Sequence, residues 1–232
     1  MKRYLGTLLF LALFIGPASA YDAAYVSSAQ VNLARLLAPP PAPQSEAQKH
    51  DLDVVLHLQA IRTPAQAARA VADNDLSLYR IAGEVLGPSF AAGRLPKLDA
   101  FYTRLNLDTR EIFFASKDAW HRARPFAASA EVNPVGEKPT SGSYPSGHAT
   151  RGYLTAILLS NMVPEKSAEL FARGREYGEN RVIAGVHYPT DVEAGRISAT
   201  VIAAAFAQNA AFMKDFGVAQ AELRQALGLA AK

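Results

Sequence analysis

The sequence contains no cysteine, and this absence removes several kinds of chemistry at once. Disulfide bonds, zinc–thiolate sites, iron–sulfur clusters and cysteine nucleophiles are all excluded. Packing of side chains must therefore hold the fold together without covalent cross-links. With 232 residues, of which 50% are hydrophobic, the chain can build one sizeable core or at most two small domains.

The sequence also lacks an excess of charge of either sign. Its formal net charge is +3, and this falls to about +1 when Lys2 and Arg3 are set aside with the amino-terminal segment. Such a balance gives no electrostatic reason to expect binding to nucleic acid or to an anionic membrane surface.

Only one run of apolar residues comes near the length of a membrane span, and it lies at the amino terminus, from Leu5 to Ile15. Two basic residues precede it, and Ala18-Ser19-Ala20 supplies the small residues that a signal peptidase reads. We therefore predict a secretory signal peptide at residues 1–20, followed by a single domain at residues 21–232. An uncleaved membrane anchor is the alternative, but the run falls short of the roughly 20 residues of a spanning helix.

The rest of the chain has the pattern of an all-α protein. Ala38 to Pro43 is rich in proline and predicts an extended connector, whereas Thr63-Pro64 and Leu95-Pro96 each have the pattern of a helix start. Residues 127–144 contain several prolines and glycines and predict a loop. Further helices are expected at residues 149–162, 167–186, 191–212 and 218–229. Because no segment shows a convincing strand alternation, we predict a compact helical bundle.

A first group of basic side chains lies between Lys117 and Pro125. The helical run that begins after Leu95 is expected to continue to Pro125. Lys117 and Arg124 are seven residues apart, nearly two helical turns, so both cations should project from one face of this helix. Taken alone, two solvated surface charges would be the simpler explanation.

A second group precedes the helix predicted at residues 149–162. There Ser146 and Gly147 would expose free backbone N–H groups at the positive end of the helix dipole, which is a ready site for an anion. His148 would lie in the first turn and could touch the same anion. Ordinary capping by Ser146, with a histidine on the surface, is the alternative.

A third group joins Asn180-Arg181 to His187 and Asp191. A turn at Pro189 separates the histidine from the start of the next helix. A carboxylate four residues after a histidine can accept a hydrogen bond from Nδ1–H, which leaves Nε2 bare as a nucleophile or metal ligand. The alternative makes Asp191 a helix cap and His187 a buried structural residue.

Together the three groups indicate a site for phosphate-ester chemistry. A lysine, two arginines and free backbone amides are what a phosphate dianion requires. Two histidines can supply a nucleophile and a general acid–base without a metal. A metal-dependent hydrolase with His148, His187 and Asp191 as ligands is one alternative, but three nearby cations would repel the metal. A non-catalytic phosphate-binding protein is another, but it would need no pairing of His187 with Asp191.

These residues resemble the signature of the type 2 phosphatidic acid phosphatase superfamily, which also contains the vanadium haloperoxidases. That signature is Lys-x6-Arg-Pro, then Pro-Ser-Gly-His, then Ser-Arg-x5-His-x3-Asp. The sequence matches it at three places: Lys117 with Arg124-Pro125, Pro145 to His148, and Arg181 with His187 and Asp191. Nearly all of the predicted mature chain resembles one branch, the bacterial class A non-specific acid phosphatases.

The resemblance implies a role for each matched residue. His187 would attack phosphorus and become phosphohistidine, Asp191 would orient it, and His148 would protonate the leaving alkoxide. The residues expected to bind phosphate are Lys117, Arg124, Ser146, Gly147 and Arg181. Asn180 stands where the signature has serine, and because its amide can also donate a hydrogen bond to phosphate, activity should survive with altered affinity.

The resemblance also implies the wider properties of the protein. We expect an all-α acid phosphatase that hydrolyses small phosphomonoesters, such as nucleotides and sugar phosphates, with no cofactor and no metal. It would be periplasmic or secreted and would form a homo-oligomer. It would bind no nucleic acid and would not stay inserted in a membrane after signal cleavage. A vanadium-dependent haloperoxidase and a lipid phosphate phosphatase are the alternatives within the superfamily.

Overall fold

The computed structural model describes residues 23–231, so the predicted signal peptide lies outside the described residues. The described part of the chain is helical and has no β-strand, which confirms the prediction of an all-α fold. None of its helices is long and apolar enough to cross a membrane. The elements are α1 (Leu33–Leu36), α2 (Glu46–Ile61), α3 (Pro64–Ala72), α4 (Leu78–Leu86), α5 (Pro96–Lys117), α6 (Pro125–Ala128), α7 (Gly147–Met162), the 3₁₀ turn η1 (Pro164–Lys166), α8 (Ser167–Ile183), α9 (Pro189–Ala207) and α10 (Ala210–Ala226).

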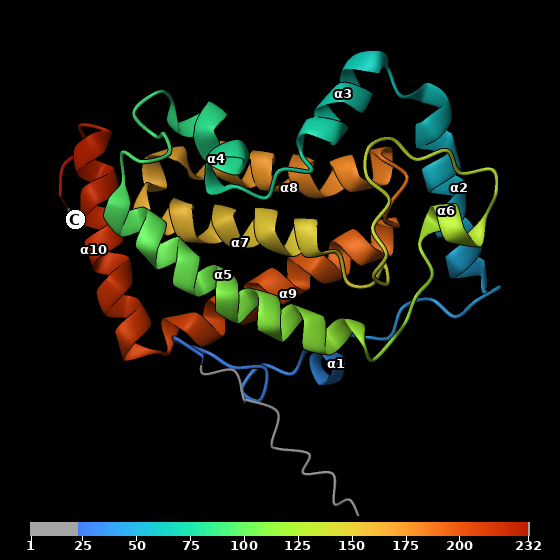
Figure 1. The fold of residues 1–232 in the computed structure, drawn as a ribbon, viewed down its shortest axis with the longest axis horizontal. Helices are drawn as coiled ribbons and strands as arrows, with labels where there is room; N and C mark the ends of the chain where they lie inside the picture. The colour runs from blue at the N-terminus through green and yellow to red at the C-terminus, as the bar shows by residue number, and fades with distance from the viewer. Residues whose placement is uncertain (1–22, 232) are drawn as a thin grey trace, which may run out of the picture.

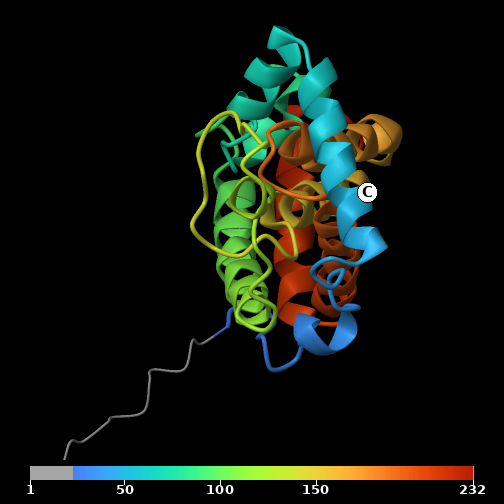
Figure 2. The same ribbon diagram turned by 90° about the vertical axis from the view of Figure 1, so that its right-hand side faces the viewer.

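Helix α7 lies at the centre of the bundle and packs against both α8 and α9. Helix α5 crosses in front of α7 and α9, while α10 closes one end of the bundle (Figure 1). At the opposite end α2 runs across the outside of the bundle, as the view onto that end shows (Figure 2). A helix surrounded in this way must be apolar on nearly all sides, and ten of the sixteen residues of α7 are buried.

Glycines allow α7 to approach its two neighbours closely. A Cβ atom at Gly174 of α8 would lie 2.8 Å from the carbonyl oxygen of Gly152 on α7. A Cβ atom at Gly195 of α9 would lie 2.7 Å from the carbonyl oxygen of Ser146. Because a carbon atom cannot pack this close to an oxygen, only glycine permits these helix separations. The start of α7, which carries Ser146 to His148, is thereby held against α9.

An aromatic cluster fixes α5 at the end of the bundle that α10 closes. The rings of Phe206 and Phe212 stack at 5.0 Å between centroids, and Phe101 of α5 lies 5.2 Å from Phe212. Tyr25 adds an edge-to-face contact with Phe212 at 5.4 Å. The backbone N–H of Tyr25 also donates to the buried carboxylate of Asp108 at 2.7 Å, which docks the start of the described chain onto α5. Helix α5 is therefore a rigid support for the residues farther along it.

The structure corrects the predicted end of this helix. Helix α5 ends at Lys117, whereas the sequence pattern predicted that it would continue to Pro125. His121 has φ of 47°, in the left-handed region that no α-helix contains, and Arg124 has the extended conformation that proline favours in the residue before it. The prediction that Lys117 and Arg124 share one helical face is therefore wrong.

A second correction concerns the carboxyl-terminal helices. The helix predicted at residues 191–212 is divided into α9 and α10, because Asn209 caps α10 by accepting a hydrogen bond from the backbone N–H of Phe212 at 2.9 Å. The helix predicted at residues 218–229 is therefore the second half of α10. The helices predicted at residues 149–162 and 167–186 agree with α7 and α8 to within three residues at each end.

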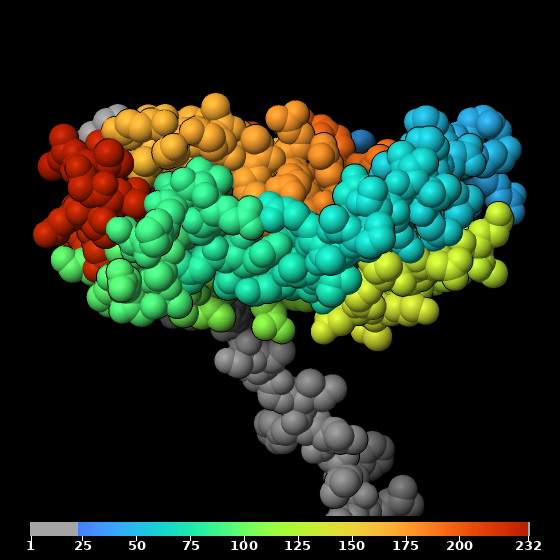
Figure 3. Space-filling view, turned by 90° about the horizontal axis from the view of Figure 1, so that it is seen from above, coloured from blue at the N-terminus to red at the C-terminus, as the bar shows by residue number. Residues whose placement is uncertain are grey.

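Helices α3 and α4 and the segment between them form one strip across the face of the molecule that Figure 3 shows, in front of α8. The fully buried carboxylate of Asp73 fastens this strip to α8. It accepts hydrogen bonds from Arg173 at 2.6 Å and Asn180 at 2.8 Å, and from Arg80 within the strip at 2.8 Å. Leu76, three residues after Asp73, lines one cavity together with residues from the first turns of α7.

Candidate active site

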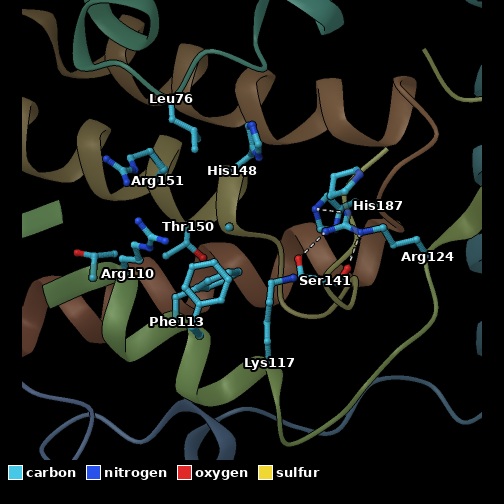
Figure 4. A pocket seen from close by; sticks show the side chains of 14 residues that line it. Leu76, Arg110, Phe113, Lys117, Arg124, Ser141, His148, Thr150, Arg151 and His187 are labelled. Carbon is cyan, nitrogen blue, oxygen red and sulfur yellow. Dashed lines mark hydrogen bonds between the residues drawn. The ribbon is translucent and has the colours of Figure 1, made fainter. Parts of the chain in front are cut away.

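A cavity of about 340 Å³ lies between α5, the start of α7 and the turn before α9. Five of the eight residues predicted to form a site line it, and they come from four separate segments of the chain (Figure 4). The lining comprises Leu76, Thr109, Arg110, Phe113, Phe114, Lys117, Arg124, Pro139, Ser141, Gly147, His148, Thr150, Arg151 and His187. None of these residues is acidic, so the cavity favours an anionic occupant.

His187 is buried and is held from both sides of its ring. Its Nδ1 lies 3.3 Å from Oδ2 of Asp191, and its Nε2 lies 3.2 Å from Nη1 of Arg124. A carboxylate only accepts hydrogen bonds and a guanidinium only donates them, so Nδ1 carries the proton and Nε2 keeps its lone pair. Burial lowers the pKa of His187 to about 3 although Asp191 opposes this shift. The ring is therefore neutral, with Nε2 available for attack.

Asp191 is fully buried, and its carboxylate has two further partners besides the imidazole. Its Oδ2 accepts the backbone N–H of Tyr188 at 2.8 Å, and its Oδ1 accepts Nη1 of Arg122 at 2.5 Å. Burial alone would raise the pKa of Asp191, but the hydrogen bond from His187, the charge of Arg122 and the hydrogen bond from the backbone of Tyr188 hold it below its ordinary value. The carboxylate stays ionised and fixes the ring that it contacts.

Arg122 is a site residue that the sequence analysis missed. Its guanidinium is buried and bridges Asp191 to Asp51 of α2, with Nη2 of Arg122 2.6 Å from Oδ2 of Asp51. It also lies over the ring of Tyr188 at 4.2 Å. The only sequence signal for a role of Arg122 was its position two residues before Arg124. That position does not indicate a carboxylate partner on a helix some 70 residues away.

Lys117 and Arg124 meet in the cavity although they do not share a helix. Nζ of Lys117 donates to the carbonyl oxygen of Gly142, while Arg124 donates to the carbonyl oxygens of Ser141 and Val186, each at 2.8 Å. Burial and the charge of Arg124 lower the pKa of Lys117 to about 7, and burial lowers the pKa of Arg124 to about 10. The lowered pKa values mean that the charged forms of both groups have too few negative charges around them. A bound oxyanion would stabilise these charged forms.

The start of α7 has the geometry expected for an anion site at a helix amino terminus. Ser146 is the N-cap and accepts a hydrogen bond from the backbone N–H of Ala149 at 3.3 Å, so its buried hydroxyl faces the helix. Gly147 lines the cavity, where a Cβ atom would lie only 2.9 Å from Cζ of Phe113. The absence of a side chain there keeps the backbone of the first turn open to the cavity.

His148 lines the same cavity, on the side that faces the segment between α3 and α4. Its Nε2 lies 3.5 Å from the carbonyl oxygen of Asn74, and its ring stacks on Tyr177 with 5.8 Å between centroids. Burial, and then the charge of Arg181, lower the pKa of His148 to about 2. Without a bound anion the ring is neutral, so a role as proton donor requires an anion that raises this pKa.

Arg181 and Asn180 lie behind the cavity rather than in its lining. Arg181 is buried, its Nη1 donates to the carbonyl oxygen of Ala70 at 3.3 Å, and its Nε has no hydrogen-bond partner among the described residues. Its charge nevertheless lowers the pKa of both His148 and Arg124, so it belongs to the same electrostatic site. Asn180 donates to Asp73 instead, which differs from the expectation that its amide would serve phosphate.

These pKa shifts predict that binding of a dianion takes up protons. The folded protein keeps His187 and His148 neutral far below the ordinary value of 6.5, so folding stability is lost as the pH falls from about 6.5 towards 3. A bound dianion raises both pKa values and restores that stability. Sulfate, which stays dianionic throughout, is therefore expected to raise the melting temperature by about 3 °C or more at pH 5 and by less at pH 8.

Thermal denaturation with and without sulfate, at constant ionic strength set with chloride, measures this difference. Lys117 strengthens the trend because it is a full cation only below its pKa of about 7. An equal sulfate effect at pH 5 and pH 8 would contradict the protonation states described here.

The sequence is similar to known phosphatases over most of its length. A profile of the PAP2 superfamily matches residues 104–213, which include every predicted site residue. A non-specific acid phosphatase of Salmonella typhimurium is 33% identical over 87% of this chain and 84% of its own length. A second, from Salmonella typhi, is 31% identical over 100% of this chain and 96% of its own length. A transmembrane PAP2-type phosphatidylglycerolphosphate phosphatase of Bacillus subtilis has a TM-score of 0.47 at 20% identity, over 75% of this chain and 88% of that one.

The chain therefore belongs to the PAP2 superfamily, and within it to the non-specific acid phosphatases. The predicted enzyme class, an acid phosphatase, is confirmed. The role of each individual site residue remains a prediction, for which the distances above provide the physical basis.

Proposed function

We propose that the enzyme hydrolyses phosphate monoesters through a covalent phosphohistidine at His187. The observation that carries the proposal is the placement of this ring, whose Nδ1 faces Asp191 and whose Nε2 faces Arg124. This arrangement leaves the lone pair of Nε2 directed into a cationic cavity. A neutral, oriented imidazole is what nucleophilic attack on phosphorus requires.

The cations around Nε2 support the binding of a phosphate dianion. Arg124, Lys117 and the backbone at Gly147 border the cavity, and Arg181 adds its charge from behind. On binding, a phosphate oxygen would replace Nε2 of His187 as the acceptor for Arg124. Phosphoryl transfer asks the protein mainly for positioning and for stabilisation of charge, and these groups supply both.

The reaction would proceed in two displacements at phosphorus. In the first, the Nε2 lone pair forms the N–P bond while the bond to the ester oxygen breaks, and the leaving alkoxide takes a proton. In the second, water attacks phosphorus, loses a proton, and the N–P bond breaks to return neutral His187 and release inorganic phosphate. Asp191 stabilises the positive charge that the ring carries between these steps.

His148 is the group that supports the proton transfers. It would give its proton to the leaving alkoxide and then take one from the attacking water. Because burial and the charge of Arg181 lower the pKa of His148 in the free enzyme, the substrate's own negative charge must raise this pKa before the ring can donate a proton. This dependence favours activity on the acidic side of neutrality.

The proposal also includes the location, the substrates and the oligomeric state of the enzyme. The signal peptide predicted at residues 1–20 supports a periplasmic or secreted location. The relatives named above are non-specific acid phosphatases, which supports small phosphomonoesters as substrates. Nucleotides and sugar phosphates are the examples that we propose. A homo-oligomer remains part of the proposal. A reaction without a metal is also part of the proposal. Among the described residues no group of three or more His, Asp or Glu side chains is placed to hold a metal ion.

Hydrolysis of a panel of phosphomonoesters, measured from pH 4 to pH 8 in excess chelator, tests the proposal. We expect turnover that survives the chelator, is highest below pH 7 and is inhibited by orthovanadate, which resembles phosphate in charge and shape. Loss of activity in chelator would favour a metal-dependent hydrolase. Halide oxidation after vanadate loading would instead favour a haloperoxidase, and tight phosphate binding without turnover would favour a binding protein.

A further inference from the structure

The cavity has a second cationic end that the proposed reaction does not use. Helices α5 and α7 run in opposite directions along its walls (Figure 1). Lys117 of α5 and Gly147 of α7 border the end near His187. Arg110 of α5 and Arg151 of α7 lie together at the other end (Figure 4).

The distance between the two ends follows from the geometry of α5. Arg110 and Lys117 are seven residues apart and both line the cavity, so they lie on one face of the helix about 10 Å apart along its axis. Phe113, one turn from each of them, lines the cavity between the two cations. A molecule held at both ends would therefore carry its two negative groups some 6–10 Å apart, with the side chains spanning the remainder.

The two arginines have donor groups to spare. Arg151 is half-buried, and Nη1 of Arg151 donates to Oδ1 of Asn106, a neutral acceptor. Arg110 is exposed, and its guanidinium lies 5.5 Å from the centre of the Phe114 ring. Neither arginine forms an ion pair with a carboxylate of the described residues. Two cations at one end of a cavity without a paired carboxylate favour the binding of a second anion there.

We propose that the cavity selects phosphomonoesters whose leaving group carries a second anionic group, a phosphate or a carboxylate, that Arg110 and Arg151 bind. The inference rests on the proposed function, because it takes the scissile phosphate to be the one held beside His187. The part of the substrate between its two anions lies against Phe113 and Leu76. A compact carbon skeleton, such as a sugar or an aromatic ring, fits this apolar middle.

A pair of matched substrates tests the inference. 4-Carboxyphenyl phosphate and 4-carbamoylphenyl phosphate have nearly the same shape, but only the first has a second negative charge. We expect the wild-type enzyme to hydrolyse the carboxylate with a kcat/KM about 10-fold higher at low ionic strength. This preference should shrink as salt is added, since screening weakens charge pairing at an accessible site. Fructose 1,6-bisphosphate against fructose 6-phosphate provides a second pair.

Variants of Arg110 and Arg151 test whether these two side chains cause the preference for the carboxylate substrate. In the double variant Arg110→Gln/Arg151→Gln, the ratio of the two kcat/KM values should fall to about 1, with the larger loss on the carboxylate. Arg110→Lys/Arg151→Lys should retain part of the preference. Arg196→Gln, which removes an exposed arginine of α9 paired with Glu193, is the matched control and should leave the ratio unchanged.

The outcomes separate this inference from the proposed function. If the wild-type enzyme hydrolyses both substrates with the same kcat/KM, the second anion site is refuted while monoester hydrolysis stands. The second anion site is likewise refuted if Arg110→Gln keeps the full preference for the carboxylate substrate. This variant should fold normally because the side chain of Arg110 is exposed. If neither substrate is hydrolysed, the proposed function itself has failed.

Discussion

Replacement of His187 by alanine is expected to lower kcat by on the order of 10⁴-fold or more, because the proposed mechanism forms its covalent intermediate on this side chain. Binding of inorganic phosphate should persist, since Lys117, Arg124 and the start of α7 remain in place. Removal of the ring also deprives Arg124 of one acceptor, so the affinity for phosphate is expected to rise slightly. Steady-state kinetics and calorimetric titration with phosphate measure the two effects separately.

His57→Ala is the matched control for this variant. His57 is an exposed histidine of α2, outside the lining of the cavity, and its loss should leave kcat and phosphate affinity unchanged. Trapping of ³²P-labelled protein after a brief reaction should label wild-type enzyme and not His187→Ala. Turnover of His187→Ala near the wild-type rate would eliminate the nucleophile assignment.

Replacement of Arg122 by methionine is expected to have the largest effect on stability. It leaves the buried carboxylates of Asp51 and Asp191 without their shared cation, and breaking a buried ion pair in this way costs about 3–5 kcal/mol. The melting temperature should fall by roughly 10 °C. In the folded enzyme kcat should fall at least about 10-fold, because Asp191 loses the partner that holds it against His187.

The expected split between kinetic constants identifies Arg122 as a positioning residue. Phosphate inhibition constants should change little in Arg122→Met, since Arg122 does not line the cavity beside His187. Arg122→Lys should recover part of the stability but less of kcat, because an ammonium cannot bridge two carboxylates with the same geometry. Arg224→Met is the control. Arg224 is a buried arginine of α10 that forms an ion pair with Glu165, outside the cavity. Its loss should lower stability and leave kcat unchanged. Equal kcat values in Arg122→Met and wild-type enzyme would refute the positioning role.

The composition of the site was predictable because its residues carry their chemistry in short segments. The Ser146-Gly147-His148 segment predicted a helix start with an open backbone, and α7 begins there. The spacing of His187 and Asp191 predicted their contact, which the structure contains. In both cases the relevant contacts join residues fewer than five positions apart, where local geometry decides the outcome.

Contacts between distant segments could not be derived from spacing. Lys117 and Arg124 do meet, but through a turn and a loop rather than on one helical face. The contact of Arg122 with Asp51 and that of Asn180 with Asp73 form only when the folded chain brings distant segments together. Neither partner has a sequence signature, because a buried aspartate on a helix looks the same in sequence as an exposed one.

The bond between Asn180 and Asp73 has a consequence for how the enzyme tolerates acid. The carboxylate of Asp73 helps to hold the segment over His148 on the bundle, together with the hydrogen bond from the Tyr177 hydroxyl to the carbonyl oxygen of Asp75. A contact made by a carboxylate weakens when the carboxylate is protonated. Burial would raise the pKa of Asp73, but hydrogen bonds from Arg173 and Asn180 hold it below its ordinary value. The segment that covers this side of the candidate active site is therefore held by a group that stays ionised as the pH falls below neutrality.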